Sequence, residues 1–310
     1  MADGLRGGQG PWQSTWRRLR RNRLAMVCLG FIVIVYTSGV FAPWIAPYSY
    51  TEQRLYEVKR PPTLAHPFGT DELGRDLFSR VVWGARSAAV VSLVSVGLAT
   101  VFGVALGALA GYAGHWIEAV IMRATDILFA FPGTLLTLFV AATIKPSVLE
   151  WVRRLESLTG WKGLARSGLV DYMVVFGCLS IVAWPGMARL VRGQVLALRN
   201  EQFIEAASCL GASTGRIVLR HVLPNAMGPV IVAVSMGLGG AVLSESVLSY
   251  LGVGIQPPNA SWGVMIWEGR DLWRTAPHLV FVPGAIIALI ILSFALLGDS
   301  LNDALNPRLK

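Results

Sequence analysis

The sequence predicts an all-α integral membrane protein with about six transmembrane helices, and two observations support that class. The chain of 310 residues is 54% hydrophobic and only 15% charged, whereas about 25% of the residues of an average soluble domain are charged. The charged residues also cluster, which leaves six long stretches without Asp, Glu, Lys or Arg. These stretches are Leu24–Thr51, Ser87–Ile117, Ile127–Ile144, Tyr172–Ala188, Val222–Ser244 and His278–Gly298.

The lengths of these stretches favour helices over strands. A bilayer core about 30 Å thick is crossed by roughly 20 helical residues, and each stretch approaches or exceeds that length. Strands of a membrane barrel would be shorter and would alternate apolar with polar residues. We therefore expect residues 24–310 to form one transmembrane domain in a lipid bilayer, since no tandem repeat divides them.

Residues 1–23 form a Gly- and Arg-rich tail before the first apolar stretch. That stretch runs to Pro47 and is too long for the apolar core of an export signal, so we interpret it as a retained first helix. Basic residues next to a first span hold the adjacent end of that span on the cytoplasmic side. Six spans then place both termini of the chain in the cytoplasm. The basic residues in question are Arg17, Arg18, Arg20, Arg21 and Arg23.

Several function classes are excluded by the residues present. The net charge of +9 is spread along the chain without aromatic interleaving, so we expect the basic residues near anionic lipid headgroups and predict no nucleic-acid partner. The three cysteines and four histidines show no metal-ligand spacing. No Gly-x-x-x-x-Gly-Lys-[Ser/Thr] occurs, so the chain has no P-loop for ATP. We predict no catalytic site, no metal site and no cofactor bound by this chain.

Three segments are expected outside the membrane: 48–86, 145–171 and 249–277. The last contains the turn Pro257-Pro258-Asn259. The middle segment has apolar residues at helical spacing, which predicts an amphipathic helix on the outer membrane surface. These apolar residues are Val148, Trp151, Val152, Leu155 and Leu158.

The segment before the second span predicts a short interfacial helix. Thr70 is a candidate N-cap, because the next two residues are acidic and suit the first turn of a helix. Asp71 with Arg75, and Asp76 with Arg80, lie at the i,i+4 spacing of helical ion pairs.

Two features inside the spans each have two interpretations. Gly103, Gly107 and Gly111 recur at every fourth position, which favours close packing against another helix over a ligand site.

Glu245 falls near the outer end of the fifth span. A carboxylate there either lines a pathway for a cationic group or forms a structural hydrogen bond or ion pair.

The cytoplasmic segment 200–224 predicts a projecting helix–turn–helix. Residues 201–210 favour a helix, and Gly211 suits the position after a helix end, where φ is positive. A second helical piece begins near Arg216 and is ended or kinked at Pro224. Such a projection has the shape to fit a groove on a partner protein.

This segment resembles a known loop. Glu205-Ala206-Ala207, then Gly211 after three residues, then Leu223-Pro224, are similar to the EAA loop of ABC-importer permeases. The resemblance implies that the loop docks into an ATPase subunit. One departure is His221, where the family usually has Ile; the peptide-transporter branch often has His.

Other segments resemble the C-type permease of dipeptide, oligopeptide and nickel importers, from about residue 15 to the end of the chain. They are 66–76, 245–254 and 298–308. The external segment 145–171 is longer than is usual for that family.

The resemblance implies the type I ABC-importer architecture in a bacterial or archaeal plasma membrane. It further implies alternating access together with a second homologous permease, two ATPase subunits that use ATP and Mg, and an external substrate-binding protein. The function expected from it is peptide import, with nickel or another small solute as the alternative.

A self-sufficient carrier or channel is a further alternative, but it would need acidic residues in mid-membrane, and the spans contain almost none. A membrane enzyme would need clustered His, Asp or Glu at a membrane face. Neither rival accounts for the EAA-like segment.

Overall fold

The computed structural model describes residues 11–161, 163–165 and 167–305. Positions 1–10 of the predicted tail, 162 and 166 of the predicted external segment, and 306–308 of the C-terminal motif lie outside the described residues. The helices, in chain order, are α1 (Pro11–Arg21), α2 (Arg23–Val40), α3 (Ala42–Ile45), α4 (Leu77–Ala113), α5 (His115–Phe129), α6 (Gly133–Thr159), α7 (Leu169–Leu198), α8 (Gln202–Cys209), α9 (Thr214–Ile217), α10 (Leu223–Tyr250), α11 (Trp262–Gly269) and α12 (His278–Leu305). Short 3₁₀ turns lie at Leu55–Glu57 and Arg270–Leu272, and a π-helical turn lies at Val218–Val222.

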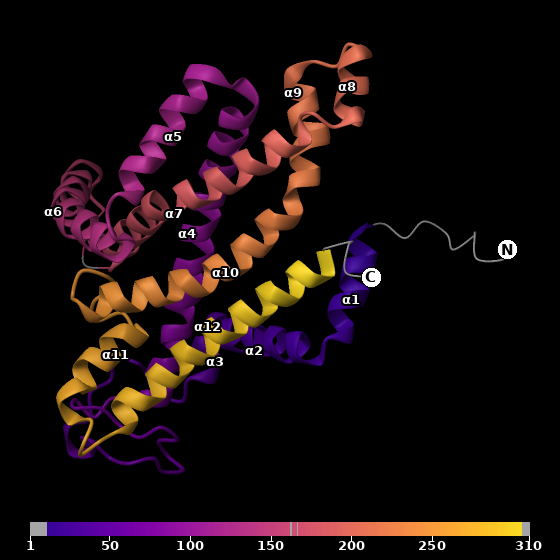
Figure 1. Cartoon of the computed structure of the whole chain (residues 1–310). Helices are drawn as coiled ribbons and strands as arrows, with labels where there is room; N and C mark the ends of the chain where they lie inside the picture. The colour runs from indigo at the N-terminus through magenta and orange to yellow at the C-terminus, as the bar shows by residue number, and fades with distance from the viewer. Residues whose placement is uncertain (1–10, 162, 166, 306–310) are drawn as a thin grey trace.

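Within the described residues, six helices are long and apolar enough to cross a membrane. They are α2, α4, α6, α7, α12 and the continuous run of α9, the π-helical turn and α10. The predicted all-α membrane class is thereby confirmed. Figure 1 shows α8 and α9 at one end of this bundle, with α11 and the loop before α4 at the opposite end.

The third predicted span is broken into two helices. The sequence 127–144 has no charge, but α5 ends at Phe129 and α6 begins only at Gly133. Pro132 lies between them. It lacks the N–H that would continue α5 and disfavours helical backbone in the residue before it, and its own extended ψ of 124° precedes the start of α6. The predicted amphipathic helix at 148–158 is helical, but as the continuation of α6 and not as a separate element.

The basic tail contains a helix that the sequence did not predict. The helix α1 buries Leu19 against the bundle, in a cluster that includes residues of α12. Asn22 then caps α2, since its side-chain oxygen accepts a hydrogen bond from the Ala25 N–H at 3.2 Å. The Asn22 amide also donates to Ser300 Oγ at 3.0 Å, so the start of α2 is fixed to the end of α12.

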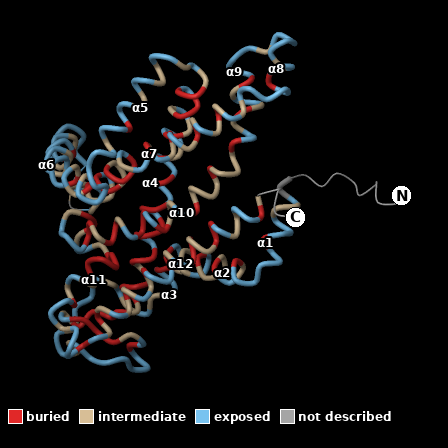
Figure 2. Tube along the Cα trace, in the orientation of Figure 1, coloured by how far each residue is buried: buried red, intermediate tan, exposed pale blue. Residues whose placement is uncertain are grey.

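The central element of the fold is α4, which contacts α2, α5, α7 and α10. The buried residues of Figure 2 concentrate where α4 crosses α10 and α11. Along α7, a Cβ at Gly103 would lie 2.5 Å from the Met187 Cβ, and one at Gly107 would lie 2.5 Å from the Ala188 carbonyl oxygen. Gly111 lies similarly close to Val195, so the three glycines contact α7 along its length.

The predicted interfacial helix before the second span is wrong. Residues 70–76 form a tight turn closed by a bridge between Thr70 and Asp76. Positive φ values at Gly69 and Gly74 direct the chain out of helical backbone. The N-cap is Asp76 and not Thr70: the Asp76 carboxylate accepts from the Ser79 N–H at 2.7 Å, and α4 begins at the next residue.

One of the two predicted ion pairs forms and the other does not. Arg75 Nε donates to Asp71 Oδ2 at 2.6 Å, which confirms the first pair. Asp76 is bonded to His66 Nδ1 at 2.9 Å instead of to Arg80. Arg80 Nη1 donates to Asp71 at 2.6 Å and to Glu268 at 2.7 Å, so it joins the loop to α11.

Candidate coupling segment and membrane cavity

The helix α8 ends in a Schellman motif, and this motif explains the spacing of the EAA-like residues. The N–H of Ala212 donates to the Ala207 carbonyl at 3.1 Å, and the N–H of Gly211 donates to the Ser208 carbonyl at 2.9 Å. Gly211 has φ +80°, the left-handed conformation that the motif requires. The helix and the turn predicted at 201–211 are confirmed.

A proline shapes the return of the chain into the fifth span. Pro224 has no N–H for a helical bond to Arg220, and the backbone before it widens into the π-helical turn, in which the Leu223 N–H reaches back to the Val218 carbonyl. The Asn225 amide donates to the His221 carbonyl at 2.6 Å. The kink predicted at this proline is therefore a π-helical turn that leads directly into α10.

The segment made of α8, Gly211 and α9, residues 202–217, is called the knob below. Two buried side chains, Ile204 and Ile217, fix it to the bundle. They join one cluster with Val191 and Val195 of α7 and with Ala108 of α4. Since Val195 also lies against Gly111, the knob rests on the end of the α4–α7 pair.

The outer side of the knob is exposed, and no described residue covers it. Leu210 is 88% exposed, and Phe203 and Glu205 are also exposed. Glu205 forms no side-chain hydrogen bond or ion pair with another described residue, and Figure 2 shows this end of the molecule almost entirely exposed. Exposed apolar side chains beside an unpaired carboxylate are typical of a surface that binds another protein.

A hydrolase-like spacing in the knob has no matching structure. Residues Gly211-Ala212-Ser213-Thr214-Gly215 have the Gly-x-Ser-x-Gly spacing of a nucleophile elbow, which needs a strand before the serine and a helix after it. Here α8 precedes the serine, and Ser213 donates no hydrogen bond to a described histidine. Within the described residues, no cluster of three His, Cys, Asp or Glu side chains suits a metal ion either.

A cavity of about 740 Å³ lies between α4, α6, α7 and α10. Its wall is mostly apolar and none of its described lining residues is charged. Small residues line it and leave it open: Gly133, Gly186, Gly237, Gly240, Ala99, Ala183, Ala233 and Ala241. Sequence patterns alone do not reveal this cavity, because its walls come from four separate helices and depend on how these helices cross.

Hydroxyl groups supply the polar part of the cavity wall. Ser95, Thr100, Thr134, Thr137 and Ser244 all line it. The Ser95 and Thr100 hydroxyls are buried and have no hydrogen-bond partner among the described residues. Unpaired hydroxyls in an apolar wall suit a guest that carries both apolar groups and hydrogen-bonding groups.

Glu245 does not line the cavity. Its carboxylate is 1% exposed, and its Oε1 accepts from the Ser249 hydroxyl at 2.7 Å and from the Ser261 hydroxyl at 2.8 Å. Ser261 is the N-cap of α11, so Glu245 joins the end of α10 to the start of α11. This geometry favours the structural interpretation of Glu245 over the pathway interpretation.

Comparisons with known proteins agree with these features. Residues 103–310 match the family model of the binding-protein-dependent transport system inner membrane component. Residues 10–62 match the N-terminal transmembrane domain of oligopeptide transport permease C.

Relatives of known name match nearly the whole chain. The dipeptide transport system permease protein of Alkalihalophilus pseudofirmus is 38% identical over 300 residues, which cover 97% of this chain and 91% of the relative. The glutathione transport system permease proteins of Escherichia coli and Shigella boydii are 39% identical over 301 residues, with the same coverage. The chain therefore belongs to the family of binding-protein-dependent transport system inner membrane components, the permease subunits of ABC importers.

Proposed function

We propose that this permease carries peptides across the membrane, driven by ATPase subunits that dock on the knob. The observation that carries the proposal is the knob itself. Its Schellman turn holds Glu205, Leu210 and Phe203 exposed on a rigid base, and the motif spacing is that of the EAA loop. The proposed assembly contains a second homologous permease, two ATPases that use ATP and Mg, and an external binding protein.

The contacts within the chain support a route for the coupling. Movement of the knob is passed through Ile204 to α7 and through the α7 contacts to α4. Both helices form walls of the cavity. A push on the knob would thus change the cavity that we propose as this subunit's part of the translocation pathway, as alternating access requires.

A peptide is the solute that the cavity and the relatives favour. The relatives are named for dipeptide and glutathione transport. The wall offers hydroxyls and apolar surface but no described His, Cys or carboxylate, which are the ligands that a nickel ion prefers.

We further propose that the knob, α1 and the end of α12 face the cytoplasm, since the arginines of α1 stand at the start of the first span.

Filling the cavity tests the pathway proposal. Gly240 lines the cavity, and a Cβ added there would meet no atom within 4 Å, so Gly240→Leu would add bulk at a cavity-lining position that has open space at its Cβ. We expect uptake of a labelled dipeptide into proteoliposomes containing the full assembly to fall at least tenfold, while the ATPases still co-purify. Gly97→Leu is the control, because Gly97 is exposed on α4, equally free of neighbours, and outside the cavity lining. Unchanged uptake by Gly240→Leu would overturn the pathway assignment.

A further inference from the structure

One face of α1 is strongly basic. Gln13, Trp16, Arg17, Arg20 and Arg21 lie at positions i, i+3, i+4, i+7 and i+8, which is a single stripe along a helix. They line a shallow depression of about 450 Å³, and all five side chains are exposed. This stripe is called the basic face below.

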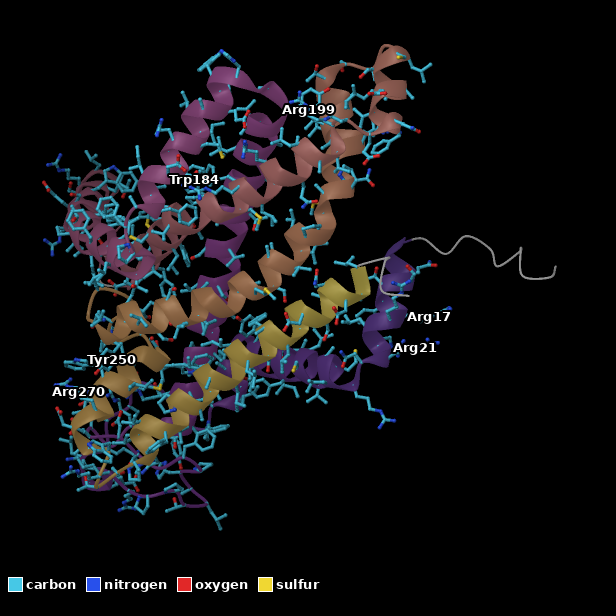
Figure 3. The ribbon with its side chains drawn as sticks, in the orientation of Figure 1. Arg17, Arg21, Trp184, Arg199, Tyr250 and Arg270 are labelled. Carbon is cyan, nitrogen blue, oxygen red and sulfur yellow. The ribbon has the colours of Figure 1, made fainter. Side chains whose placement is uncertain are left out.

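The charges of the basic face are unpaired within the described chain. Arg17, Arg20 and Arg21 form no ion pair with a described acidic side chain. Figure 3 shows Arg17 and Arg21 extending from α1 away from the helical bundle. Three guanidinium groups around one depression form a concentrated positive charge, and guanidinium binds phosphate oxygens in a bidentate geometry.

The position of α1 indicates where that anion comes from. Only Asn22 separates α1 from the first apolar span, and Figure 1 shows α1 turning across the direction of α2. The helix thus lies at the level where a bilayer has its headgroups, with Trp16 in the middle of the basic face and 48% exposed. A basic amphipathic helix with an exposed tryptophan at this level is typical of an interfacial lipid-binding helix.

The opposite face of α1 is attached to a spanning helix. Leu19 is 5% exposed and packs in the cluster that contains residues of α12. Asn22, directly after α1, donates to Ser300 of α12. A ligand held by the basic face would therefore hold the end of α12 in place.

We propose that the basic face of α1 is a binding site for the phosphate headgroup of an anionic phospholipid. A docking surface for an acidic region of an ATPase is the competing occupant. The lipid is favoured because the exposed tryptophan lies beside the arginines, and an indole suits the headgroup level of a bilayer.

The test uses the full assembly, purified and stripped of lipid. Native mass spectrometry would follow binding of dioleoylphosphatidylglycerol and, separately, dioleoylphosphatidylcholine. The variant is Arg17→Gln with Arg20→Gln and Arg21→Gln. The control removes the same charge elsewhere, by Arg123→Gln with Arg153→Gln and Arg274→Gln, all exposed and outside any described ion pair.

We expect the wild type and the control to bind phosphatidylglycerol more tightly than phosphatidylcholine. The α1 variant should lose about 100-fold in affinity for phosphatidylglycerol, since each arginine near a lipid surface contributes roughly a factor of five. Its affinity for phosphatidylcholine and its melting temperature should not change, which excludes misfolding as the cause.

Three outcomes would overturn the proposal. The first is an α1 variant that binds phosphatidylglycerol as the wild type does. The second is inorganic phosphate alone binding as tightly as the lipid and displacing it, which would make this a site for free phosphate. The third is an α1 variant that keeps its lipid affinity but loses the ATPases on purification, which would make the basic face a contact with the ATPase.

Discussion

Glu245 carries a carboxylate in the interior of a membrane helix, where an unpaired charge is very unfavourable. Its oxygens are bonded to Ser249 and Ser261, and Ser249 Oγ in turn accepts from the Ile255 N–H at 3.0 Å. The acid thus organises the turn after α10 and the start of α11. At the scale of single residues, its role is to fix the loop between α10 and α11.

Replacing Glu245 separates this role from solute binding. Glu245→Gln keeps an oxygen that accepts from both serines, so we expect near-normal melting temperature and peptide uptake. Glu245→Ala removes the acceptor to which the Ser249 and Ser261 hydroxyls donate, and should lower the free energy of unfolding by about 1–3 kcal/mol. Thermal unfolding of the purified assembly and dipeptide uptake are the measurements. Loss of uptake in Glu245→Gln at unchanged stability would instead support a pathway carboxylate.

At the scale of elements, the α4–α7 pair is the support for both the knob and the cavity. Its closeness depends on the glycines, because a side chain at Gly107 would meet the Ala188 backbone. In lipid, such small residues let two backbones approach and gain van der Waals contact.

We expect Gly107→Ala to destabilise the pair by about 1–3 kcal/mol, the typical effect of overpacking. Gly97→Ala on the same helix has open space at its Cβ and should be neutral or slightly stabilising. Thermal unfolding in one detergent compares the two variants directly. Equal melting temperatures would show that the close α4–α7 contact is not needed.

The loop before α4 is joined to α11 by a second element-scale feature, a network of two arginines and two acids. Arg75 and Arg80 both donate to Asp71 and to Glu268, at 2.6–2.9 Å. Burial lowers the pKa of Arg75, but Asp71 and Glu268 more than offset it, and the pKa rises above its usual value. The guanidinium therefore stays charged at any pH where the protein is folded.

Breaking this network should be costly. Glu268→Ala leaves two largely buried guanidiniums with one acid, and we expect a loss of about 3 kcal/mol in the free energy of unfolding. Glu72→Ala is the control, since Glu72 forms an exposed pair with Lys59 at 3.6 Å and should contribute less than about 1 kcal/mol. If the melting temperatures of Glu268→Ala and Glu72→Ala fall by the same amount, this account of the loop is contradicted.

At the scale of the whole molecule, periodicity and charge predicted the membrane class, the spans other than the broken third one, and the helix–turn–helix of the knob. These predictions succeeded because each depends on neighbours in sequence: apolar length for the spans, and Gly211 for the turn. The helix α1 was missed because its arginines dominate its composition, whereas its stability depends on Leu19 packing against α12.

The turn at residues 70–76 and the cavity could not be predicted for a related reason. The i,i+4 spacing of Asp76 and Arg80 indicated a pair, but Asp76 caps α4 and bonds His66, while Arg80 meets Glu268 across 188 positions. The cavity depends on how four helices cross. Both features depend on contacts between residues that are distant in the sequence, and a single sequence does not indicate which distant residues are in contact.

The central claim is that the knob couples this permease to ATPase subunits, and Gly211 tests it most directly. Gly211→Asp strains a backbone at φ +80° and adds a carboxylate beside the exposed Leu210. Gly160→Asp is a matched control, because Gly160 has φ +74°, open space at its Cβ, and lies at the end of α6.

The measurement is purification of the assembly in mild detergent, with quantification of the ATPases that travel with each variant and of ATP-driven dipeptide uptake. We predict that the wild type and Gly160→Asp retain the ATPases and transport, whereas Gly211→Asp inserts in the membrane but loses both. Retention of ATPases and uptake by Gly211→Asp, or uptake by this chain alone without ATP, would contradict the account.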